Sequence, residues 1–561
     1  YRRYARACAN GGVVDFSELL LRSYELLLQN ERLLKHYQNR FKHILVDEFQ
    51  DTNKLQYAWL KLLADQGACV MAVGDDDQSI YAFRGANTGN MLSFEADFAI
   101  EKVVKLEQNY RSLGNILDGA NALIKNNDGR LGKNLWTDQG EGEPIRVFRA
   151  TTDGEEASFI IEEIQALKNS GIQLKSIALL YRSNAQSRIL EHGLFSSGLP
   201  YKVYGGLRFF ERQEVKHALA YLRLIANSDD DGALLRIINF PTRGIGNRTI
   251  ENIRDLAERT GISLWQAACS APLSGRAVTA VTSFVTLIEK LKNETSGFSL
   301  PDLIEHSIEN SGLVEHYQKD RDGQDRLENL NELINAASAF IDERASAPNL
   351  EAQVEVSADE DFSLIEIDPL IDFLAHASLE AGDNQASFGE DALQLMTVHA
   401  AKGLEFHSVF ISGLEEGLFP HENSINEHGG LEEERRLMYV AMTRAMRRLY
   451  LSHSQMRMLH GQTRYNIESR FIDEIPGELL KKINDAKPTA TSAPQRAHAP
   501  VTASQKAPGG FRIGQQVQHT KFGLGVIIQI EGQGPDARLQ VNFRDSGLKW
   551  LALEYAKLTR A

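Results

Sequence analysis

The sequence is poor in cysteine and has no apolar run of membrane-spanning length. Three cysteines occur among 561 residues, Cys8, Cys69 and Cys269, and none belongs to a CxxC pair. This spacing provides neither a disulfide framework nor a cysteine-based metal site, and it fits a reducing compartment. No apolar segment approaches the roughly 20 residues that a membrane-spanning helix needs, and the first residues show no signal-peptide pattern.

An excess of positive charge is also absent. The 61 Lys and Arg residues are outnumbered by 76 Asp and Glu residues, which gives a formal net charge of −15. This balance argues against a protein that coats nucleic acid through charge alone, but a local basic groove stays open because steering depends on charge distribution. The length predicts three or four domains, and no internal repeats are found.

Short apolar runs that end in polar residues mark the expected strands of the first part of the chain. Residues 44–46 and 68–73 are short apolar runs that each end in acidic residues, which predicts a parallel α/β sheet with a ligand at that edge. Strand and helix patterns alternate through 145–204, and helical periodicity dominates 205–340. Beyond a Pro-, Ala-, Ser- and Thr-rich stretch at 484–510, four short strands with glycine-containing turns predict a small β-barrel of SH3 or Tudor type.

The first acidic pair, Asp47 and Glu48, follows the run His43–Val46. Such a pair is commonly the solvated end of an edge strand. A glycosidase pair is unfavourable, because adjacent strand residues point to opposite faces. A nucleotide site, in contrast, needs a hard oxygen ligand for Mg²⁺ and a neighbouring carboxylate that orients or deprotonates water. From the residues alone, the solvated end and the nucleotide site both stay open.

Four further segments carry candidate chemistry. In VGDDDQSIYAFRGAN, Tyr81, Phe83 and Arg84 suit stacking on unpaired bases, although for this segment alone core aromatics beside a turn are the simpler interpretation. In LEQNYRS, Tyr110 suits stacking on a purine and Arg111 suits phosphate oxygens. In VHAAKGLEF, a glycine loop separates Lys402 from Glu405, and EEERRLMYVAMTRA supplies a cation that suits a polyphosphate. The last segment is expected to place Arg444 on a helix.

Taken in order, these segments resemble the motifs of the UvrD/PcrA-type superfamily 1 DNA helicases. LVDEFQDTN, YRSNAQSR and YGGLRFFERQEVK are similar as well, so the resemblance covers nearly the whole chain. It implies an α/β fold of two RecA-like motor lobes of the P-loop NTPase type, the first incomplete, with a helical insertion domain and a small C-terminal Tudor/SH3-like β-barrel. The implied parts are a remnant of the first lobe's helical insertion (1–41), the C-terminal part of the first lobe (42–107), the second lobe (108–204 and 389–475), the helical insertion (205–388), a disordered linker (476–510) and the barrel (511–561).

The resemblance also implies roles for individual residues. The implied catalytic residues are Asp47, Glu48, Gln78, Arg111 and Arg444, with Asp47 and Glu48 at the metal. The implied nucleotide contacts are Tyr110, Arg111, Glu405 and Arg444. The implied DNA contacts are Tyr81, Phe83, Arg84, His399, His421, Gly244, Ile245, Gly246 and His460.

Two of these positions differ from the residues usual in the family, and a third position is a glycine-containing loop. Phe83 stands where the family usually has tryptophan, which keeps stacking with less area. His460 occupies the place of an aromatic residue that wedges the duplex fork, which puts its role as a pin in doubt. The loop at Gly244 and Gly246 lets backbone N–H groups approach a phosphate, but by spacing alone it is equally a tight turn before a helix.

The function implied by the resemblance is that of an ATP- and Mg²⁺-dependent 3′→5′ helicase or translocase. It would act on single-stranded DNA and on junctions between single- and double-stranded DNA, in mismatch repair, nucleotide excision repair and replication, in the bacterial cytoplasm and without a membrane. Its implied partners are RNA polymerase, through the barrel, and repair proteins. An ATP-independent DNA-binding or protein-docking fragment is the alternative, and an RNA-directed relative also stays open because stacking contacts barely distinguish the sugar.

A phosphate-binding loop is the missing element. No GxxxxGK[ST] occurs: Gly132-Lys133 is followed by Asn134, and Gly403 follows Lys402 in the wrong order. The chain starts at Tyr1, in mid-pattern. We therefore expect an N-terminal truncation, and hydrolysis close to background for these residues alone.

Overall fold

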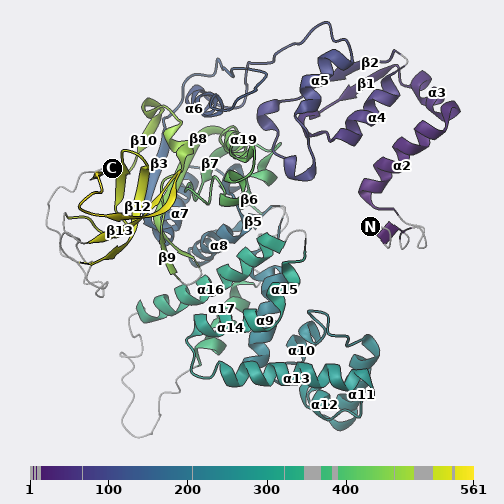
Figure 1. Cartoon of the computed structure of the whole chain (residues 1–561), viewed down its shortest axis with the longest axis vertical. Helices are drawn as coiled ribbons and strands as arrows, with labels where there is room; N and C mark the ends of the chain where they lie inside the picture. The colour runs from purple at the N-terminus through teal and green to yellow at the C-terminus, as the bar shows by residue number, and fades with distance from the viewer. Residues whose placement is uncertain are drawn as a thin grey trace.

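The computed structural model describes residues 4–5, 8, 14–65, 67–204, 206–320, 323–346, 368–381, 390–459, 462–484, 510–532 and 537–560. Figure 1 shows an N-terminal α/β unit, a second and larger α/β unit, a helical unit below it and a β-rich C-terminal unit beside it. The candidate site lies between the two α/β units.

The first α/β unit has a two-stranded parallel sheet, as the two acid-terminated runs predict. A capping box between Asn53 and Gln56 starts helix α4 directly after the acidic turn. Phe49 of the turn packs with Tyr57 and Leu60 of α4, which anchors the turn against the sheet. The elements are α2 (Phe16–Gln29), α3 (Glu31–Arg40), β1 (His43–Val46), α4 (Lys54–Ala64), β2 (Cys69–Ala72) and α5 (Gly89–Asp97).

The second α/β unit contains an eight-stranded sheet with the order β10-β3-β8-β7-β4-β6-β5, and β9 pairs with β8. All neighbours along this path are parallel, and only β9 runs antiparallel. Two separate apolar cores cover the two faces, which explains why every residue of β4 is buried. The strands are β3 (Ile145–Thr152), β4 (Ile177–Tyr181), β5 (Tyr201–Val203), β6 (Leu393–Thr397), β7 (Phe406–Ile411), β8 (Ala445–Leu459), β9 (Gln462–Tyr465) and β10 (Leu480–Lys482).

Helices cover both faces of this sheet (Figure 1). They are α6 (Gly114–Ile124), α7 (Asp153–Asn169), α8 (Ser187–Ser196), α18 (Glu422–Ile425), α19 (Gly430–Met442) and α20 (Arg470–Asp473). One boundary of the sequence prediction is wrong. The linker expected over 476–510 begins too early, because residues 480–482 form the edge strand β10 beside β3. Residues 485–509 lie outside the described residues.

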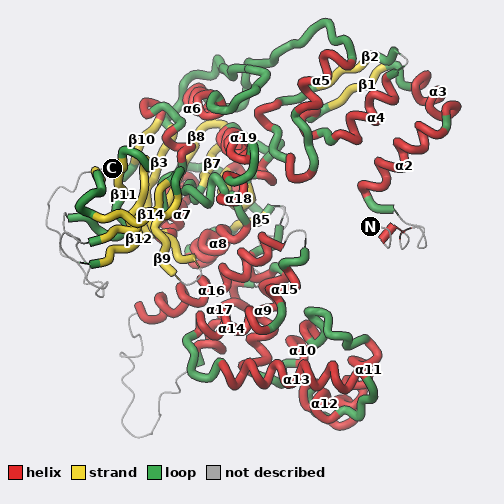
Figure 2. Tube along the Cα trace, in the orientation of Figure 1, coloured by secondary structure: helices red, strands yellow, loops and turns green. Residues whose placement is uncertain are grey.

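The helical unit is inserted between two neighbouring strands of the sheet. β5 and β6 pair with each other, yet the chain between them runs through the whole unit, which Figure 2 shows to be mostly helix. The predicted helical periodicity is confirmed, and one continuous apolar core joins these helices. They are α9 (Gln213–Ala226), α10 (Asp231–Ile237), α11 (Asn247–Thr260), α12 (Leu264–Ser270), α13 (Arg276–Glu294), α14 (Leu300–Asn310), α15 (Leu313–Tyr317), α16 (Gly323–Ser346) and α17 (Pro369–Glu380).

The C-terminal unit is a five-stranded antiparallel sheet with the order β14-β13-β12-β11-β15. The four predicted strands are present, and a fifth, β15, pairs with β11. Ion pairs from Arg544 to Asp473 and from Arg470 to Asp545 join this unit to the second α/β unit. The strands are β11 (Gln516–His519), β12 (Gly523–Glu531), β13 (Arg538–Phe543), β14 (Gly547–Ala552) and β15 (Leu558–Arg560). Within the described ranges, no helix has both the length and the apolar character needed to cross a bilayer.

Candidate functional site

The acidic turn after β1 has a strained backbone. Glu48 adopts φ 49° and ψ 43°, in the left-handed region that residues other than glycine rarely occupy. Its N–H donates to Asp47 Oδ1 at 2.9 Å, and Gln50 Nε2 donates to Glu48 Oε2 at 2.5 Å. Gln50 Oε1 accepts from the N–H of Asp75 at 2.9 Å, so one side chain holds the turn against the end of β2. Both acids remain exposed.

The loop after β2 is paired with cations of the second unit. Arg130 donates to both carboxylate oxygens of Asp77 at 2.7 and 2.6 Å, and Asp77 is only 1% exposed. Lys133 forms an ion pair with Asp75. Gln78 Nε2 donates to the same Asp75 carboxylate at 2.6 Å. The amide of Gln78, one of the implied catalytic residues, is therefore held by its own loop, a few residues beyond the sheet edge.

Lys402 joins the two acidic segments, and its role was missed in the sequence prediction. Its Nζ donates to Asp51 Oδ2 at 2.6 Å and to the backbone oxygen of Gln78 at 2.9 Å. Glu48 Oε2 lies 3.6 Å from the same Nζ. The side chain is only 5% exposed. The sequence signal for this role was the lysine of VHAAKGLEF. It directly precedes Gly403, which has φ +84° and ends the turn.

Two arginines and Glu405 gather at the amino ends of β7 and β8. Phe406 of β7 pairs with Ala445 of β8, so the preceding residues Glu405 and Arg444 lie side by side. Arg111 reaches the same place from the segment before α6 and donates from Nε to Glu405 Oε2 at 2.6 Å. The structure therefore brings together three of the four predicted nucleotide contacts.

Arg444 is a buried cation whose hydrogen-bond partners are uncharged. Helix α19 ends at Met442, so Arg444 lies just beyond the helix on which the sequence predicts it. The residue is 2% exposed, and its guanidinium donates to the backbone oxygens of Val440 and Leu404 and to the Thr443 hydroxyl. Burial, and after it the like charge of Arg111, lower the pKa of Arg444 to about 10. At neutral pH the group keeps its charge, and an anion placed beside it would be stabilised.

Tyr110, the fourth predicted nucleotide contact, presents an open ring. The residue is 71% exposed, and its hydroxyl donates to Gln108 Oε1 at 2.9 Å. The ring face stays free to stack on a planar group. Across the described residues, no hydrogen bond or ion pair joins Asp47 or Glu48 to Arg111 or Arg444.

A second group of predicted residues forms an aromatic cluster between the units. Phe83 is 60% exposed, and its ring lies 5.6 Å from that of His399 in an edge arrangement. The Arg84 guanidinium lies over both Tyr81 and Phe83, at 5.3 and 5.4 Å from the ring centroids. Tyr81 is half-buried and donates to the His399 backbone oxygen at 3.5 Å. The exposed rings and cation suit stacked bases and a phosphate backbone.

His399 is held neutral. Burial, with the positive charge of Arg182 as the next cause, lowers the pKa of His399 to about 4. Arg182 follows β4 and His399 follows β6, and because these strands are parallel neighbours, both residues lie at the same sheet edge. Arg182 in turn donates from Nε and from a terminal nitrogen to Glu434 at 2.7–3.1 Å.

The remaining predicted DNA contacts are divided. The His421 N–H donates to Glu434, and its Nε2 lies 3.5 Å from Glu328 of the helical unit, so this ring is already engaged. Gly244 has φ +79°, and a Cβ added at Gly244 or Gly246 would meet nothing within 4 Å. Ile245 between them is buried in the helical core, so only its backbone is available to a ligand. His460 lies outside the described residues.

The donor set fits a magnesium-bound polyphosphate. Asp47 and Glu48 offer exposed carboxylate oxygens, which are the ligands that Mg²⁺ prefers. Arg444 offers a buried positive charge without an anionic hydrogen-bond partner. Arg111 is paired with Glu405 and can exchange this partner for a phosphate oxygen.

Comparisons with known proteins match three family models along the chain. Residues 1–99 match the model of the UvrD/REP helicase N-terminal domain, residues 104–456 match the UvrD-like helicase C-terminal domain, and residues 513–560 match the PcrA/UvrD tudor domain. The chain is 48% identical to DNA helicase II of Escherichia coli (strain K12), over 100% of this chain and 76% of that protein. It is 46% identical to DNA helicase II of Haemophilus influenzae, over 100% and 75%. It is 40% identical to the ATP-dependent DNA helicase PcrA of Bacillus subtilis, over 100% and 76%.

Proposed function

The chain belongs to the UvrD-like DNA helicases, and from this membership we propose that it is an ATP-driven 3′→5′ translocase on single-stranded DNA. In this proposal the two α/β units are RecA-like motor lobes of the P-loop NTPase type that close on ATP and Mg²⁺. The observation that carries it is the buried Arg444 guanidinium, which has no anionic hydrogen-bond partner among the described residues and lies beside Arg111 and Glu405. A buried cation without a carboxylate partner is costly, and the phosphates of a bound nucleotide would compensate it.

Asp47 and Glu48 would divide the chemistry of hydrolysis. Asp47 would hold Mg²⁺, and the metal, when bound, would neutralise charge on the phosphates. Glu48 would take the proton of the attacking water. Its carboxylate is oriented by the 2.5 Å hydrogen bond from Gln50 and by Lys402 at 3.6 Å. The strained backbone of Glu48 favours this role, because strain of this kind is maintained mainly where the position of a side chain matters.

Arg111 and Arg444 would stabilise charge on the transferred phosphoryl group. Arginines supplied across a cleft are worth roughly 10³–10⁵ in rate in enzymes of this type. Tyr110 would stack on the base, and Glu405 would hold the ribose. Because the acids belong to one unit and the arginines to the other, hydrolysis would require the two units to close.

Lys402 supports coupling between ATP and DNA. It contacts Asp51 and the Gln78 backbone oxygen, and its Nζ lies 5.0 Å from the Tyr81 ring centroid. Tyr81 belongs to the aromatic cluster that would stack on single-stranded DNA together with Phe83, Arg84 and His399. A movement of Gln78 on closure would therefore move the base-stacking surface, and each cycle would shift the grip on DNA.

Direction, pathway and partners are proposed on family membership. They are 3′→5′ unwinding from a single-stranded tail, action in mismatch and nucleotide excision repair and in replication, and contact of the C-terminal unit with RNA polymerase and of the chain with repair proteins. The Gly244–Gly246 loop would contact duplex DNA through its backbone. The 561 residues contain no GxxxxGK[ST], so alone they should hydrolyse ATP near background.

The test is DNA-stimulated ATP hydrolysis by these 561 residues and by the full-length product of the gene. Glu48→Gln in the full-length protein should abolish hydrolysis, while the matched change Glu101→Gln, on an exposed loop of the same unit, should leave it intact. Duplexes with a 3′ or a 5′ single-stranded tail test direction, and an RNA strand tests the RNA-directed alternative. If the full-length protein binds DNA but does not hydrolyse ATP, the motor proposal is wrong and the chain is an ATP-independent DNA-binding or docking protein.

A further inference from the structure

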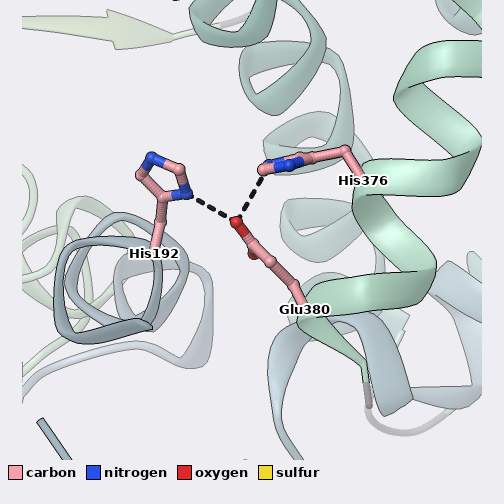
Figure 3. A group of neighbouring side chains, drawn as sticks. All are labelled: His192, His376 and Glu380. Atoms are coloured by element: carbon pink, nitrogen blue, oxygen red, sulfur yellow. Dashed lines mark hydrogen bonds and ion pairs between the residues drawn. The ribbon is translucent and has the colours of Figure 1, made fainter. Parts of the chain in front are cut away.

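Two histidines and a glutamate converge between the second α/β unit and the helical unit, away from the nucleotide and DNA residues. His192 lies on α8 of the α/β unit, and His376 and Glu380 lie one turn apart on α17 of the helical unit (Figure 3). Glu380 Oε1 lies 2.5 Å from His192 Nδ1 and 3.0 Å from His376 Nε2. One oxygen thus meets a nitrogen from each ring, and both rings point toward it.

We propose that His192, His376 and Glu380 form a Zn²⁺ site that joins the two units. Their three candidate ligand atoms all lie within 4.8 Å of one another. Tetrahedral Zn²⁺ with bonds of about 2.0–2.2 Å keeps its ligand atoms roughly 3.3 Å apart, so small side-chain movements admit the ion. Two imidazoles and one carboxylate, with a fourth position left for water, are a ligand set of a zinc site with an open position.

The surroundings of the cluster also suit a bound ion. Glu343 Oε1 of α16 lies 2.9 Å from His192 Nε2, the nitrogen that faces away from the cluster. A carboxylate on the outer nitrogen of a metal-binding histidine fixes the ring and raises its basicity. The Phe340 ring, at 5.3 Å from that of His376, holds the second imidazole in place.

Charge and ligand type select the ion. With neutral imidazoles, Glu380 and Glu343 supply two negative charges that balance one divalent cation. Nitrogen ligands disfavour Mg²⁺ and Ca²⁺, which prefer oxygen, and favour Zn²⁺ or a similar transition metal. Arg208 donates to the backbone oxygens of Glu380 and Ala381 at 3.4 and 2.8 Å, so this cation is directed to the helix end and not to the Glu380 carboxylate.

The site is independent of the proposed motor. It would fasten α17 to α8 across a sequence separation of 188 residues, at the junction where the helical unit leaves the sheet. Zn²⁺ binding there would hold the two units together whether or not ATP is hydrolysed.

The experiment is metal titration of the 561-residue chain after chelator treatment, with Zn²⁺ in competition with a chromophoric chelator and with Co²⁺ as a spectroscopic probe. We expect one Zn²⁺ per chain and the visible absorption of tetrahedral Co²⁺. His376→Gln, which keeps a donor toward Glu380, should weaken Zn²⁺ binding roughly 100-fold or more and remove the Co²⁺ spectrum. Glu343→Gln, on an exposed side chain, should weaken it about 10-fold without disturbing the fold.

The matched control is His306→Gln. His306 also pairs with a carboxylate, Glu294 at 3.0 Å, on an exposed face of the helical unit, but outside any group of three metal-binding side chains found in the described part of the chain. This variant should bind Zn²⁺ as the unsubstituted chain does. Equal binding by the His376→Gln and His306→Gln variants, or no tetrahedral Co²⁺ spectrum in the unsubstituted chain, would overturn the proposal. Circular dichroism of each variant separates loss of binding from loss of folding.

Discussion

Lys402 Nζ lies 2.6 Å from Asp51 Oδ2, although 351 residues separate the two along the chain. The pair joins the first α/β unit to the second. Burial raises the pKa of Asp51, and the neighbouring ammonium of Lys402 opposes this shift. The ammonium therefore compensates for a carboxylate that is partly removed from water.

Removing this cation should loosen the contact between the units. Lys402→Met leaves the Asp51 carboxylate unpaired, so we expect a loss of about 1–3 kcal/mol in the free energy of unfolding. The double variant Asp51→Asn/Lys402→Met should recover part of it, because no unpaired charge remains. Urea unfolding measures both. Lys61→Met, which breaks the more exposed pair with Asp97, should cost less than about 1 kcal/mol.

Arg444 should matter more for nucleotide binding than for folding. Arg444→Met removes a buried charge whose hydrogen bonds go to uncharged oxygens, so the free energy of unfolding should change little or rise. The affinity of the full-length protein for a fluorescent ATP analogue should fall about 10- to 100-fold, the worth of a charged hydrogen bond.

Arg435 provides the contrast for that measurement. It is equally buried, but it donates to both oxygens of Glu474 at 2.7 Å. Arg435→Met should destabilise the fold by about 3–5 kcal/mol, because it leaves the Glu474 carboxylate without its partner cation. If Arg444→Met destabilised as strongly, the idea of a cation held ready for an anion would be wrong.

Phe83 should contribute to binding of single-stranded DNA. Loss of one stacked ring is worth about 1–3 kcal/mol, so Phe83→Ala should weaken the affinity for oligo-dT by about 10- to 100-fold. Fluorescence anisotropy measures this directly. Phe298→Ala, on a partly exposed ring of the helical unit, is the control and should leave the affinity unchanged. An equal loss in both variants would indicate a general effect on folding.

The helical unit should lose stability in mild acid. Burial, with Arg236 as the next cause, lowers the pKa of His217 to about 4, while an unfolded histidine titrates near 6.5. Between these values the unfolded chain binds more protons, so stability falls as the pH falls from about 6.5 to 4, by roughly 3 kcal/mol at most for this group. His217→Gln should flatten the pH dependence of urea unfolding across this window. An unchanged slope would show that other groups dominate.

Periodicity and motif order were enough to predict several features of the fold. The two apolar runs that end at Asp47 and near Asp75 predicted the parallel pair correctly, but their expected burial is wrong: Leu45 is 76% exposed and Met71 is 57% exposed, because the described part of this sheet has only two strands. The helical insertion was predicted from its helical periodicity, and the β-rich C-terminus from short strands separated by glycine-containing turns. The end of α19 and the strand β10 were misjudged, because helix ends and short edge strands depend on packing partners that lie far away in the sequence.

Contacts between distant segments could not be predicted. Gln50 appeared in a quoted motif without a role, and Lys402 was noted only for its neighbours Gly403 and Glu405. His192 and His376 showed no sequence signal, because each is an ordinary helical histidine until α8 and α17 meet.

The sequence by itself determined the family, the order of the motifs and the chemical types available at the site, since these are properties of residues and their local spacing. Only the tertiary structure decided that Lys402 faces Asp51, that Arg444 is buried without an anionic hydrogen-bond partner, and that two histidines and a glutamate share one point. The physical reason is that the charge, burial and pairing of a side chain depend on what surrounds it in space. Those surroundings are contributed by segments hundreds of residues apart.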